Sequence, residues 1–397
     1  MMSRRWFLLR SGALAFGSAL STGCVTTTRS PPSAGLGNVL VLIELNGGND
    51  GLNTVIPYAD PLYAKLRPKI GLAREEVVQL DATTALHPGL APLKPSWDAG
   101  ECAIVQSVGY EKPNLSHFRS IEIWDTASAS DATVADGWVA RALAPRQPLA
   151  GRVAEGVVLG RPVVGPLYGA KARVAMMQDA SGFASQARRV AKPGTMATPT
   201  AALQHVVTTQ AELRAAGDGI YDRLQQMRVP LQTVFPRTGI GGQLANAARL
   251  IAANVDVPVI KLSHGSFDTH TYQRNPHDRL IGELGAALAA FRQAMIERNA
   301  WGRVTVMTYA EFGRRPAENS AQGTDHGTAA PHFVLGGAVR GGFKGVAPRL
   351  DQLDGGGNLR HGVEFQSLYA TMLKRWWGID PAPVLGRSFP ELDLFLT

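Results

Sequence analysis

Four short stretches rich in apolar residues stand out along the chain and predict buried strands. They cover residues 38–45, 102–108, 257–262 and 303–309. A run without polar alternation is typical of a strand that is covered on both faces, as in a parallel sheet. Amphipathic stretches between and after these runs predict helices at 243–254, 278–299 and 364–377. Strands that alternate with helices predict an α/β fold, a layered α/β/α domain with a mostly parallel central sheet.

The remainder of the chain divides into a tether and one domain. Residues 25–37 are rich in Thr, Ser, Pro and Gly, which predicts a flexible linker. Residues 38–397 then form a single domain. Its middle part, near 150–240, contains Ala- and Gln-rich helical stretches without marked chemistry, and we interpret it as a helical insertion.

The first 24 residues have the order of an export signal. Arg4 and Arg5 precede bulky apolar residues, and an apolar stretch at 13–20 is too short to span a bilayer as a helix. This order predicts a twin-arginine signal peptide, handled by the Tat translocase, and a periplasmic or membrane-anchored protein. Cys24 ends a sequence similar to a lipobox, but Ser21 stands where a large aliphatic residue is usual. Lipidation at Cys24, which would tether the chain without spanning the membrane, stays open.

Composition narrows the class of protein. The chain has 397 residues, of which 45% are hydrophobic and 18% charged, as in ordinary globular proteins. The formal net charge is +8, but no long basic run follows the signal, so no nucleic-acid partner is expected. A mild positive charge suits a small anionic substrate. Cys102 lies inside an apolar run and is expected to be a buried hydrophobe, not half of a disulfide.

Candidate chemistry lies in the loops that follow the predicted strands. Ligands of α/β proteins bind at the carboxyl ends of the strands. These loops contain several Asp residues and five histidines: His117, His264, His270, His326 and His332. Asp and His together suit a divalent metal such as zinc or manganese, and two such ions can clamp a phosphoryl group during transfer. The alternative is that each histidine is an ordinary hydrogen-bonding or capping group.

Ser116 is a candidate nucleophile. It directly precedes a helical stretch, and the positive end of a helix dipole favours an alkoxide or a bound anion. Arg119 lies on the same face three residues later and could hold a phosphate or sulfate group. The alternative for these two residues is a helix N-cap and a surface ion pair.

Several of these stretches together resemble one bacterial family, known as domain of unknown function 1501. They are LNGGNDGLN at 45–53, LHPGL at 86–90, SHFRS at 116–120, FDTH at 267–270, EFGR at 311–314 and GTDHG at 323–327. The resemblance also includes the twin-arginine start and covers nearly the whole chain. The family is grouped with the alkaline phosphatase-like superfamily of phosphatases, sulfatases and phosphomutases. The resemblance therefore implies an alkaline phosphatase-like fold with two metal ions and a Ser or Thr nucleophile.

The resemblance also implies roles for individual residues. Ser116 is similar to the nucleophile, with Arg119 beside it. The implied metal ligands are Asp50, Asp268, His270, Asp325, His326 and His332, with His361 as a substitute for His332. Two departures from the superfamily pattern bear on this set. The loop between the last strand and Asp325 is long, so that Glu311 at the strand end is an alternative ligand, and Asp268 and His270 are unusually close in sequence.

Two functions follow as hypotheses. The first is an exported metal-dependent hydrolase of phosphate or sulfate esters that uses Ser116 and divalent ions, zinc, manganese or calcium. The second is a non-catalytic envelope protein that keeps the fold as a binding or assembly module. Members of the resembled family are often encoded beside another secreted family, which suits a partner protein. The second hypothesis predicts that the Asp and His side chains do not converge.

Overall fold

The computed structural model describes residues 29–143, 152–169, 172–190 and 200–397. The predicted twin-arginine signal and the possible lipobox at Cys24 lie outside the described residues. Among the helices in these ranges, none has the length and apolar character needed to cross a membrane.

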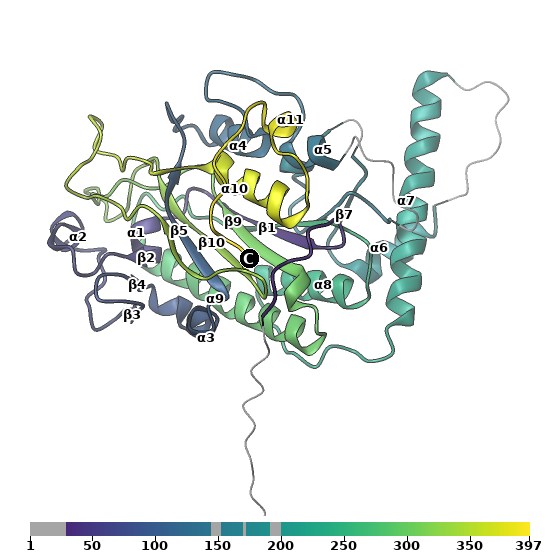
Figure 1. Ribbon diagram of the computed structural model, residues 1–397, viewed down its shortest axis with the longest axis horizontal. Helices are drawn as coiled ribbons and strands as arrows, with labels where there is room; N and C mark the ends of the chain where they lie inside the picture. The colour runs from purple at the N-terminus through teal and green to yellow at the C-terminus, as the bar shows by residue number, and fades with distance from the viewer. Residues whose placement is uncertain (1–28, 144–151, 170–171, 191–199) are drawn as a thin grey trace, which may run out of the picture.

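A nine-stranded sheet forms the centre of the fold (Figure 1). From one edge to the other the strands are β11 (Gly342–Gly345), β5 (Cys102–Gly109), β10 (Ala330–Gly336), β9 (Val304–Tyr309), β1 (Val39–Asn46), β8 (Val259–Gly265), β6 (Gly156–Leu159) and β7 (Val174–Met177). The short β12 (Val363–Glu364) also pairs with β5. All pairings are parallel except those of β10, which is antiparallel to both of its neighbours. Consequently β5, β9, β1 and β8 all end at the same edge of the sheet.

Helices cover both faces of this sheet, as the unbroken apolar runs predict. Along β1, Val41 and Ile43 pack into one apolar cluster while Leu40 and Leu42 pack into another. The first cluster lies under α8 (Gly239–Ala252) and α9 (Arg274–Glu297), and the second under α4 (His117–Thr126), α5 (Trp138–Leu143) and α10 (Phe365–Thr371). Figure 1 shows these helices on opposite sides of the sheet. The predicted layered α/β class and mostly parallel sheet are confirmed.

The other elements are smaller and peripheral. Short helices are α1 (Gly51–Thr54), α2 (Pro61–Leu66), α3 (Lys94–Asp98), α6 (Ala180–Ala187) and α11 (Ala382–Leu385), and the long α7 (Ala201–Gln226) packs on α6. A second sheet contains β2 (Val55–Ile56), β4 (Ala85–Leu86) and β3 (Val78–Gln79). Single 3-10 turns lie at Pro88–Leu93, Gly165–Leu167 and Trp301–Arg303, and a π-helical turn at Met372–Trp376 follows α10.

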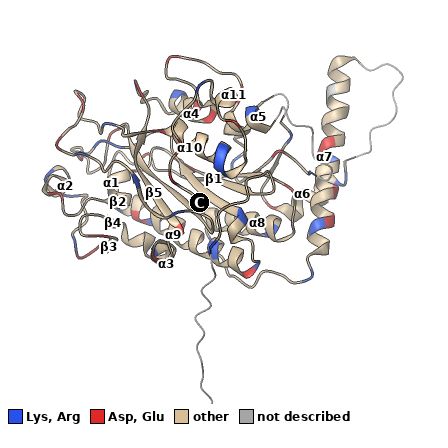
Figure 2. Cartoon of the chain, in the orientation of Figure 1, with Lys and Arg blue, Asp and Glu red and all other residues tan. Residues whose placement is uncertain are grey.

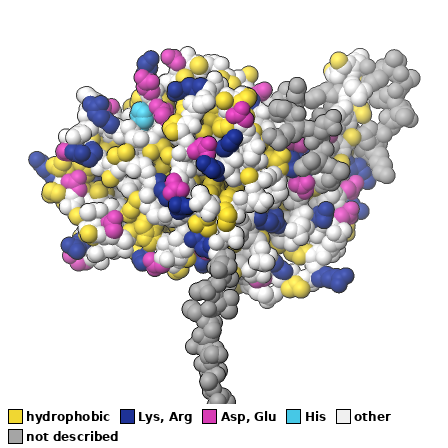
Figure 3. Space-filling view, viewed as in Figure 1, with side chains coloured by type: hydrophobic (Ala, Val, Ile, Leu, Met, Phe, Trp, Pro, Cys, Tyr) yellow, Lys and Arg dark blue, Asp and Glu magenta, His cyan; other side chains and the backbone are white. Residues whose placement is uncertain are grey.

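Charged residues are distributed without a dominant patch on the views shown. Figure 2 shows Lys and Arg interspersed with Asp and Glu along the helices, α7 among them. On the face drawn in Figure 3, acidic, basic and hydrophobic side chains alternate over the surface. This distribution gives no support to a nucleic-acid surface on that face.

Two observations add to the expected domain organisation. The predicted insertion near 150–240 also supplies β6 and β7, which extend the central sheet beyond β8. Each of these strands has four residues, too few for a periodic signal in the sequence. The predicted linker packs on the domain from Arg29 onward, since the guanidinium of Arg29 donates to the carbonyls of Ala99 and Gly100 at 2.8 Å each.

Candidate metal centre

Four side chains converge at the edge where the parallel strands end. Asp268 follows β8, and its Oδ1 lies 3.0 Å from His270 Nε2 and 3.2 Å from His326 Nε2. Its Oδ2 lies 3.4 Å from Nε2 of His117, the first residue of α4. The Nε2 atoms of His270 and His326 are 3.0 Å apart. We call these four residues the Asp268 cluster; they come from three separate segments of the chain.

In two of the three imidazoles the other nitrogen is hydrogen-bonded to an oxygen that orients the ring, and in His270 it lies near a carboxylate. Nδ1 of His117 lies 2.7 Å from Glu311 Oε1, and Nδ1 of His326 lies 2.8 Å from the carbonyl oxygen of Leu115. Nδ1 of His270 lies 3.6 Å from Asp325 Oδ1. An imidazole whose Nδ1 is held by a carboxylate or carbonyl presents Nε2 outward, which is the usual arrangement around a protein-bound metal.

Asp268 and His326 are in the protonation states in which such groups bind a metal ion. Burial opposes ionisation of Asp268, but the hydrogen bond and charge of Arg314 outweigh it and lower its pKa to about 2. Burial lowers the pKa of His326, so this ring is neutral at pH 7. Because the Leu115 carbonyl only accepts, the proton of His326 sits on Nδ1 and its Nε2 lone pair faces the Asp268 carboxylate. His117 behaves differently, because its hydrogen bond to Glu311 raises its pKa.

These donors fit a divalent metal ion. Nε2 of His117 is buried and has no hydrogen-bond partner in the described structure. Two nitrogens that each bind zinc at about 2.05 Å in tetrahedral geometry lie about 3.4 Å apart, close to the spacing of His270 and His326. His117, Asp268 and His326 also present ligand atoms within 4.8 Å of one another. The residues that would hold the ion are therefore His117, Asp268 and His326, with His270 beside Asp268 and His326.

Arg314 is a fixed charge beside the Asp268 cluster. Its buried guanidinium donates to Asp268 Oδ1 at 2.6 Å. It also donates to the backbone carbonyls of Gly48 at 2.7 Å and Thr324 at 2.9 Å, and to that of Gly47. These backbone contacts hold Arg314 in place and keep Asp268 ionised.

Ser116 lies at the rim of the Asp268 cluster. It is exposed and occupies the N-cap position of α4, but its hydroxyl makes no capping hydrogen bond. Its backbone amide donates to Asn114 Oδ1 at 2.9 Å instead. Both chain neighbours of Ser116 contact the cluster, Leu115 through its carbonyl oxygen and His117 through its ring. The Ser116 hydroxyl therefore does not make the N-cap hydrogen bond that the alternative role of a helix cap would require.

Asp50 lies outside the Asp268 cluster, contrary to the expectation that it joins Asp325 and His326. Its carboxylate is fully buried and forms an ion pair with Arg67 at 2.6 Å. Burial opposes ionisation, but the charge of Arg67 outweighs it and the pKa of Asp50 is lowered. Arg67, on the segment after α2, supplies the cation that pairs with Asp50 inside the protein.

His332 and Arg119 also take other places than expected. β10 runs away from the site edge, so His332 is buried inside the sheet with its ring 5.1 Å from that of Trp124. Neither of its ring nitrogens has a hydrogen-bond partner among the described residues, and burial lowers its pKa to about 3. Arg119 binds Glu122 at 2.9 Å and the carbonyl oxygen of Ala132 at 2.6 Å, so its charge is used within the protein.

The remaining candidates have secondary positions. Asp325 contacts His270 from behind, and its backbone carbonyl accepts from Arg315 at 3.0 Å. His361, the substitute for His332, lies 3.2 Å from Glu364. Sequence reasoning gave His117 no specific role, although it stands in the SHFRS stretch directly after Ser116.

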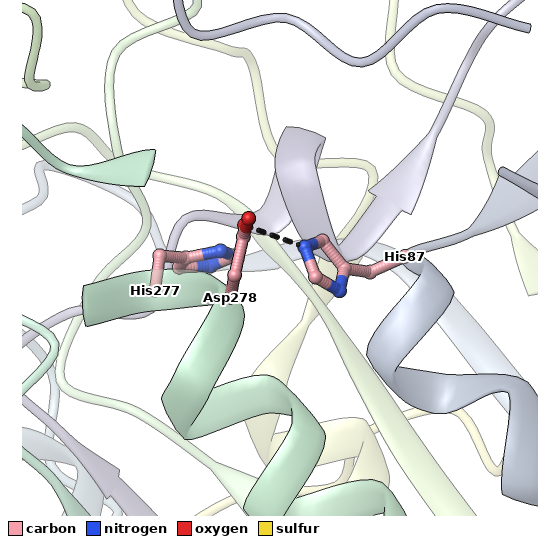
Figure 4. A group of neighbouring side chains, drawn as sticks. All are labelled: His87, His277 and Asp278. Atoms are coloured by element: carbon pink, nitrogen blue, oxygen red, sulfur yellow. Dashed lines mark hydrogen bonds and ion pairs between the residues drawn. The ribbon is translucent and has the colours of Figure 1, made fainter. Parts of the chain in front are cut away.

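A second group of titratable side chains lies between α9 and the turn after β4 (Figure 4). His87 Nδ1 accepts from the Gly89 amide at 3.0 Å, so its proton is on Nε2, which lies 2.8 Å from Asp278 Oδ1. His277 Nε2 lies 3.2 Å from Asn49 Oδ1. Because the Nε2 of His87 is already protonated by this arrangement, the group is a hydrogen-bonded anchor of α9 and a poor metal site.

Comparisons with known proteins bear on the family and the fold. A family described as Protein of unknown function (DUF1501) matches residues 38–389. The comparison with curated proteins gives no match.

Solved structures that resemble the chain include the lipoteichoic acid synthase LtaP from Listeria monocytogenes, at 10% identity and a TM-score of 0.34, over 78% of this chain and 69% of that one. The C-terminal periplasmic domain of EcEptC from Escherichia coli, in complex with zinc, has 9% sequence identity and a TM-score of 0.35, over 77% of this chain and 73% of that one. A protein in the alkaline phosphatase superfamily from Vibrio parahaemolyticus has 10% sequence identity and a TM-score of 0.35, over 78% of this chain and 62% of that one. The third belongs to the superfamily that the motifs resemble; at these TM-scores the likenesses carry no argument about activity.

Proposed function

We propose, from the premise that this chain belongs to the DUF1501 family of proteins of unknown function, that it is a metal-dependent hydrolase of phosphate or sulfate esters. One observation carries the proposal: ligand atoms of His117, Asp268 and His326 lie within 4.8 Å of one another, and an oxygen at hydrogen-bond distance from Nδ1 orients each of the two rings. A nitrogen-rich set of ligands favours zinc or manganese over calcium, which prefers oxygen ligands.

When bound, a divalent ion would supply positive charge that stabilises the ester oxygens and lowers the pKa of a nearby hydroxyl. In the proposed reaction Ser116 Oγ attacks phosphorus or sulfur and releases its proton to water. The bond to the ester oxygen breaks and the alcohol leaves with a proton from water. A water molecule then hydrolyses the seryl ester and restores Ser116. The N-terminal amides of α4 favour an anionic group at this position.

Arg119 has no substrate-binding role in this proposal, because its guanidinium is bound to Glu122 and Ala132. Arg314 acts indirectly, since it keeps Asp268 ionised and in place. The substrate is a small anionic ester, and either a phosphate or a sulfate fits the same charge requirement.

The cellular context is proposed from the sequence. Arg4 and Arg5 support export by the Tat translocase to the periplasm, and Cys24 is the candidate for a lipid anchor. A co-encoded secreted protein is the proposed partner. Cell fractionation of the parent and an Arg4→Lys/Arg5→Lys variant tests the export step, and retention of both in the periplasm would contradict it.

The non-catalytic alternative is favoured by one observation, that Asp50 and Arg119 are both fully engaged within the protein. Under this alternative the protein is a binding or assembly module with the same fold. This alternative predicted that the Asp and His side chains do not converge; because Asp268, His270 and His326 do lie together, it now requires metal binding without turnover of any ester.

Hydrolysis of p-nitrophenyl phosphate and p-nitrophenyl sulfate by the zinc- or manganese-loaded protein separates the two functions. We expect Ser116→Ala to lower kcat by at least about 10³-fold, since an interaction of the reacting atom is lost. Its thermal stability and metal content should stay at the parent level, because the Ser116 hydroxyl is exposed and makes no capping bond. Ser130→Ala serves as the control, and equal activity of parent and Ser116→Ala would exclude Ser116 as nucleophile.

A further inference from the structure

We infer that the site binds one divalent ion per chain, and that the guanidinium of Arg67 takes the place of the second cation implied by the family resemblance. The inference rests on the proposed function, because it concerns the number of ions at the same site. It follows from the different surroundings of Asp50 and Asp268.

The Asp50 carboxylate has no oxygen available for a metal. Oδ2 lies 2.6 Å from Arg67 Nη1 and Oδ1 lies 3.0 Å from Arg67 Nη2. The amide of Leu52 also donates to Oδ1 at 3.2 Å, and the side-chain amide of Gln273 donates to Oδ2. A carboxylate accepts about four hydrogen bonds, and here these donors fill both oxygens.

The guanidinium of Arg67 likewise has a hydrogen-bond acceptor for each of its donors. Besides its two bonds to Asp50, it donates from Nε to the Pro316 carbonyl at 2.8 Å and from Nη1 to Asn53 Oδ1 at 2.8 Å. Nη2 donates to the carbonyl of Arg315 at 3.0 Å. All five donor positions of the guanidinium are therefore used. An ion at Asp50 would have to displace Arg67 and leave a buried charge without its partner, which is strongly unfavourable.

Asp50 instead positions the loops that form the Asp268 cluster. Gln273, which donates to Asp50, accepts from Thr324 at 2.6 Å and from Thr269 at 3.1 Å. Thr269 directly precedes His270, and Thr324 lies two residues before His326. Asp50 is thus a positioning residue: its charge is neutralised by Arg67 and its hydrogen bonds fix the ligand loops.

Asp268 differs from Asp50 in its exposure to solvent and in the partners of its carboxylate oxygens. Its side chain is 40% exposed, whereas that of Asp50 is 0% exposed. Arg314 occupies Oδ1, but Oδ2 faces Nε2 of His117, which has no hydrogen-bond partner. The Asp268 carboxylate thus meets imidazole nitrogens at a partly exposed position, whereas the Asp50 carboxylate meets only N–H donors in the interior.

Metal content measures the number of ions directly. The mature protein would be stripped with a chelator, dialysed against zinc or manganese, and analysed by inductively coupled plasma mass spectrometry. We expect one ion per chain in the parent and none in Asp268→Asn. The double variant Asp50→Asn/Arg67→Gln should keep one ion per chain, because it removes a buried pair without leaving a lone charge. Circular dichroism would establish that each variant is folded.

The outcomes separate this inference from the function on which it rests. Two ions per chain in the parent would overturn the inference and leave the proposed hydrolase intact. A parent that binds no ion would contradict both. The parent stoichiometry decides the question even if the double variant does not fold.

Discussion

Two aspartates at neighbouring strand ends have opposite roles because of the donors around them. Asp50 meets a buried guanidinium and backbone or amide N–H groups, whereas Asp268 meets imidazole nitrogens as well as Arg314. The first arrangement completes a structural ion pair, and the second leaves room for a ligand. At the scale of single residues, the identity of the partner therefore decides what a carboxylate does.

Removal of Arg67 alone should be costly. Arg67→Gln leaves the fully buried Asp50 carboxylate without its cation, and we expect it to lower the free energy of unfolding by about 3–5 kcal/mol. The double variant Asp50→Asn/Arg67→Gln should lose clearly less than the single variant, and urea unfolding measures both. The control is Arg349→Gln, which breaks an exposed ion pair with Asp351 and should leave the stability unchanged. A double variant less stable than Arg67→Gln would contradict this account.

His332 should make the protein sensitive to acid. Its folded pKa is lowered to about 3 by burial, whereas an unfolded histidine has a pKa of about 6.5. As pH falls from 6.5, the unfolded state takes up a proton that the folded state does not. This group therefore lowers the free energy of unfolding by about 1.4 kcal/mol per pH unit, until pH approaches the folded pKa.

His332→Phe should remove this contribution. Between pH 6.5 and 5 we expect the variant to lose about 2 kcal/mol less stability than the parent, as measured by urea unfolding at each pH. His277, whose pKa burial lowers to about 4, remains in both proteins and accounts for part of the residual slope. Identical slopes for variant and parent would show that His332 is accessible to protons in the folded state.

At the scale of elements, the turn after β1 sets the geometry of the site. Gly47 has a φ of 108°, and its amide donates to Glu311 Oε1 at 2.9 Å. A Cβ at this position would lie 2.5 Å from the amide nitrogen of Asp268. The turn can therefore approach the Asp268 loop only with glycine at this position.

Gly47→Ala should disturb the metal centre through the backbone. We expect a loss of about 1–3 kcal/mol in stability from the strained backbone. Metal affinity should fall by about 10–100-fold, because Asp268 and the Glu311 that orients His117 both shift. Calorimetric titration with zinc measures the affinity, and Gly355→Ala, where a Cβ meets nothing within 4 Å, is the control. Unchanged zinc affinity in Gly47→Ala would contradict the role of the turn.

Strands with long apolar stretches were predictable from the sequence, whereas short strands and the antiparallel strand β10 were not. The runs before Asp50 and Asp268 correspond to β1 and β8, and they place both aspartates at the same sheet edge, as expected. β10 was missed; its antiparallel direction starts it at the site edge, where Ala330 pairs with Val108, but the side chain of His332 is buried beside Trp124. Strand direction depends on pairing partners far along the chain, so the pattern within β10 could not reveal it.

On the scale of the whole molecule, the sequence indicated the residue types of the site but not their partners. Asp268, His270 and His326 do meet, and Glu311 lies behind His117 at the strand end that made it an alternative candidate. The pairing of Asp50 with Arg67 depends on a close approach between the α2 segment and the turn after β1. Such side-chain contacts follow from tertiary packing, which neither periodicity nor spacing encodes.

The order of the strands has a consequence for how the chain folds during synthesis. β1 is the first strand to emerge, yet it lies between β8 and β9, so that Leu40 pairs with both Val259 and Thr305. At about 5–20 residues per second, the ribosome needs on the order of 10–50 s to supply these neighbours. During that time the apolar VLVLIELN segment has both edges open and is prone to aggregation. The fold therefore has a high contact order, and a chaperone that shields β1 until translation is nearly complete would raise the yield of native protein.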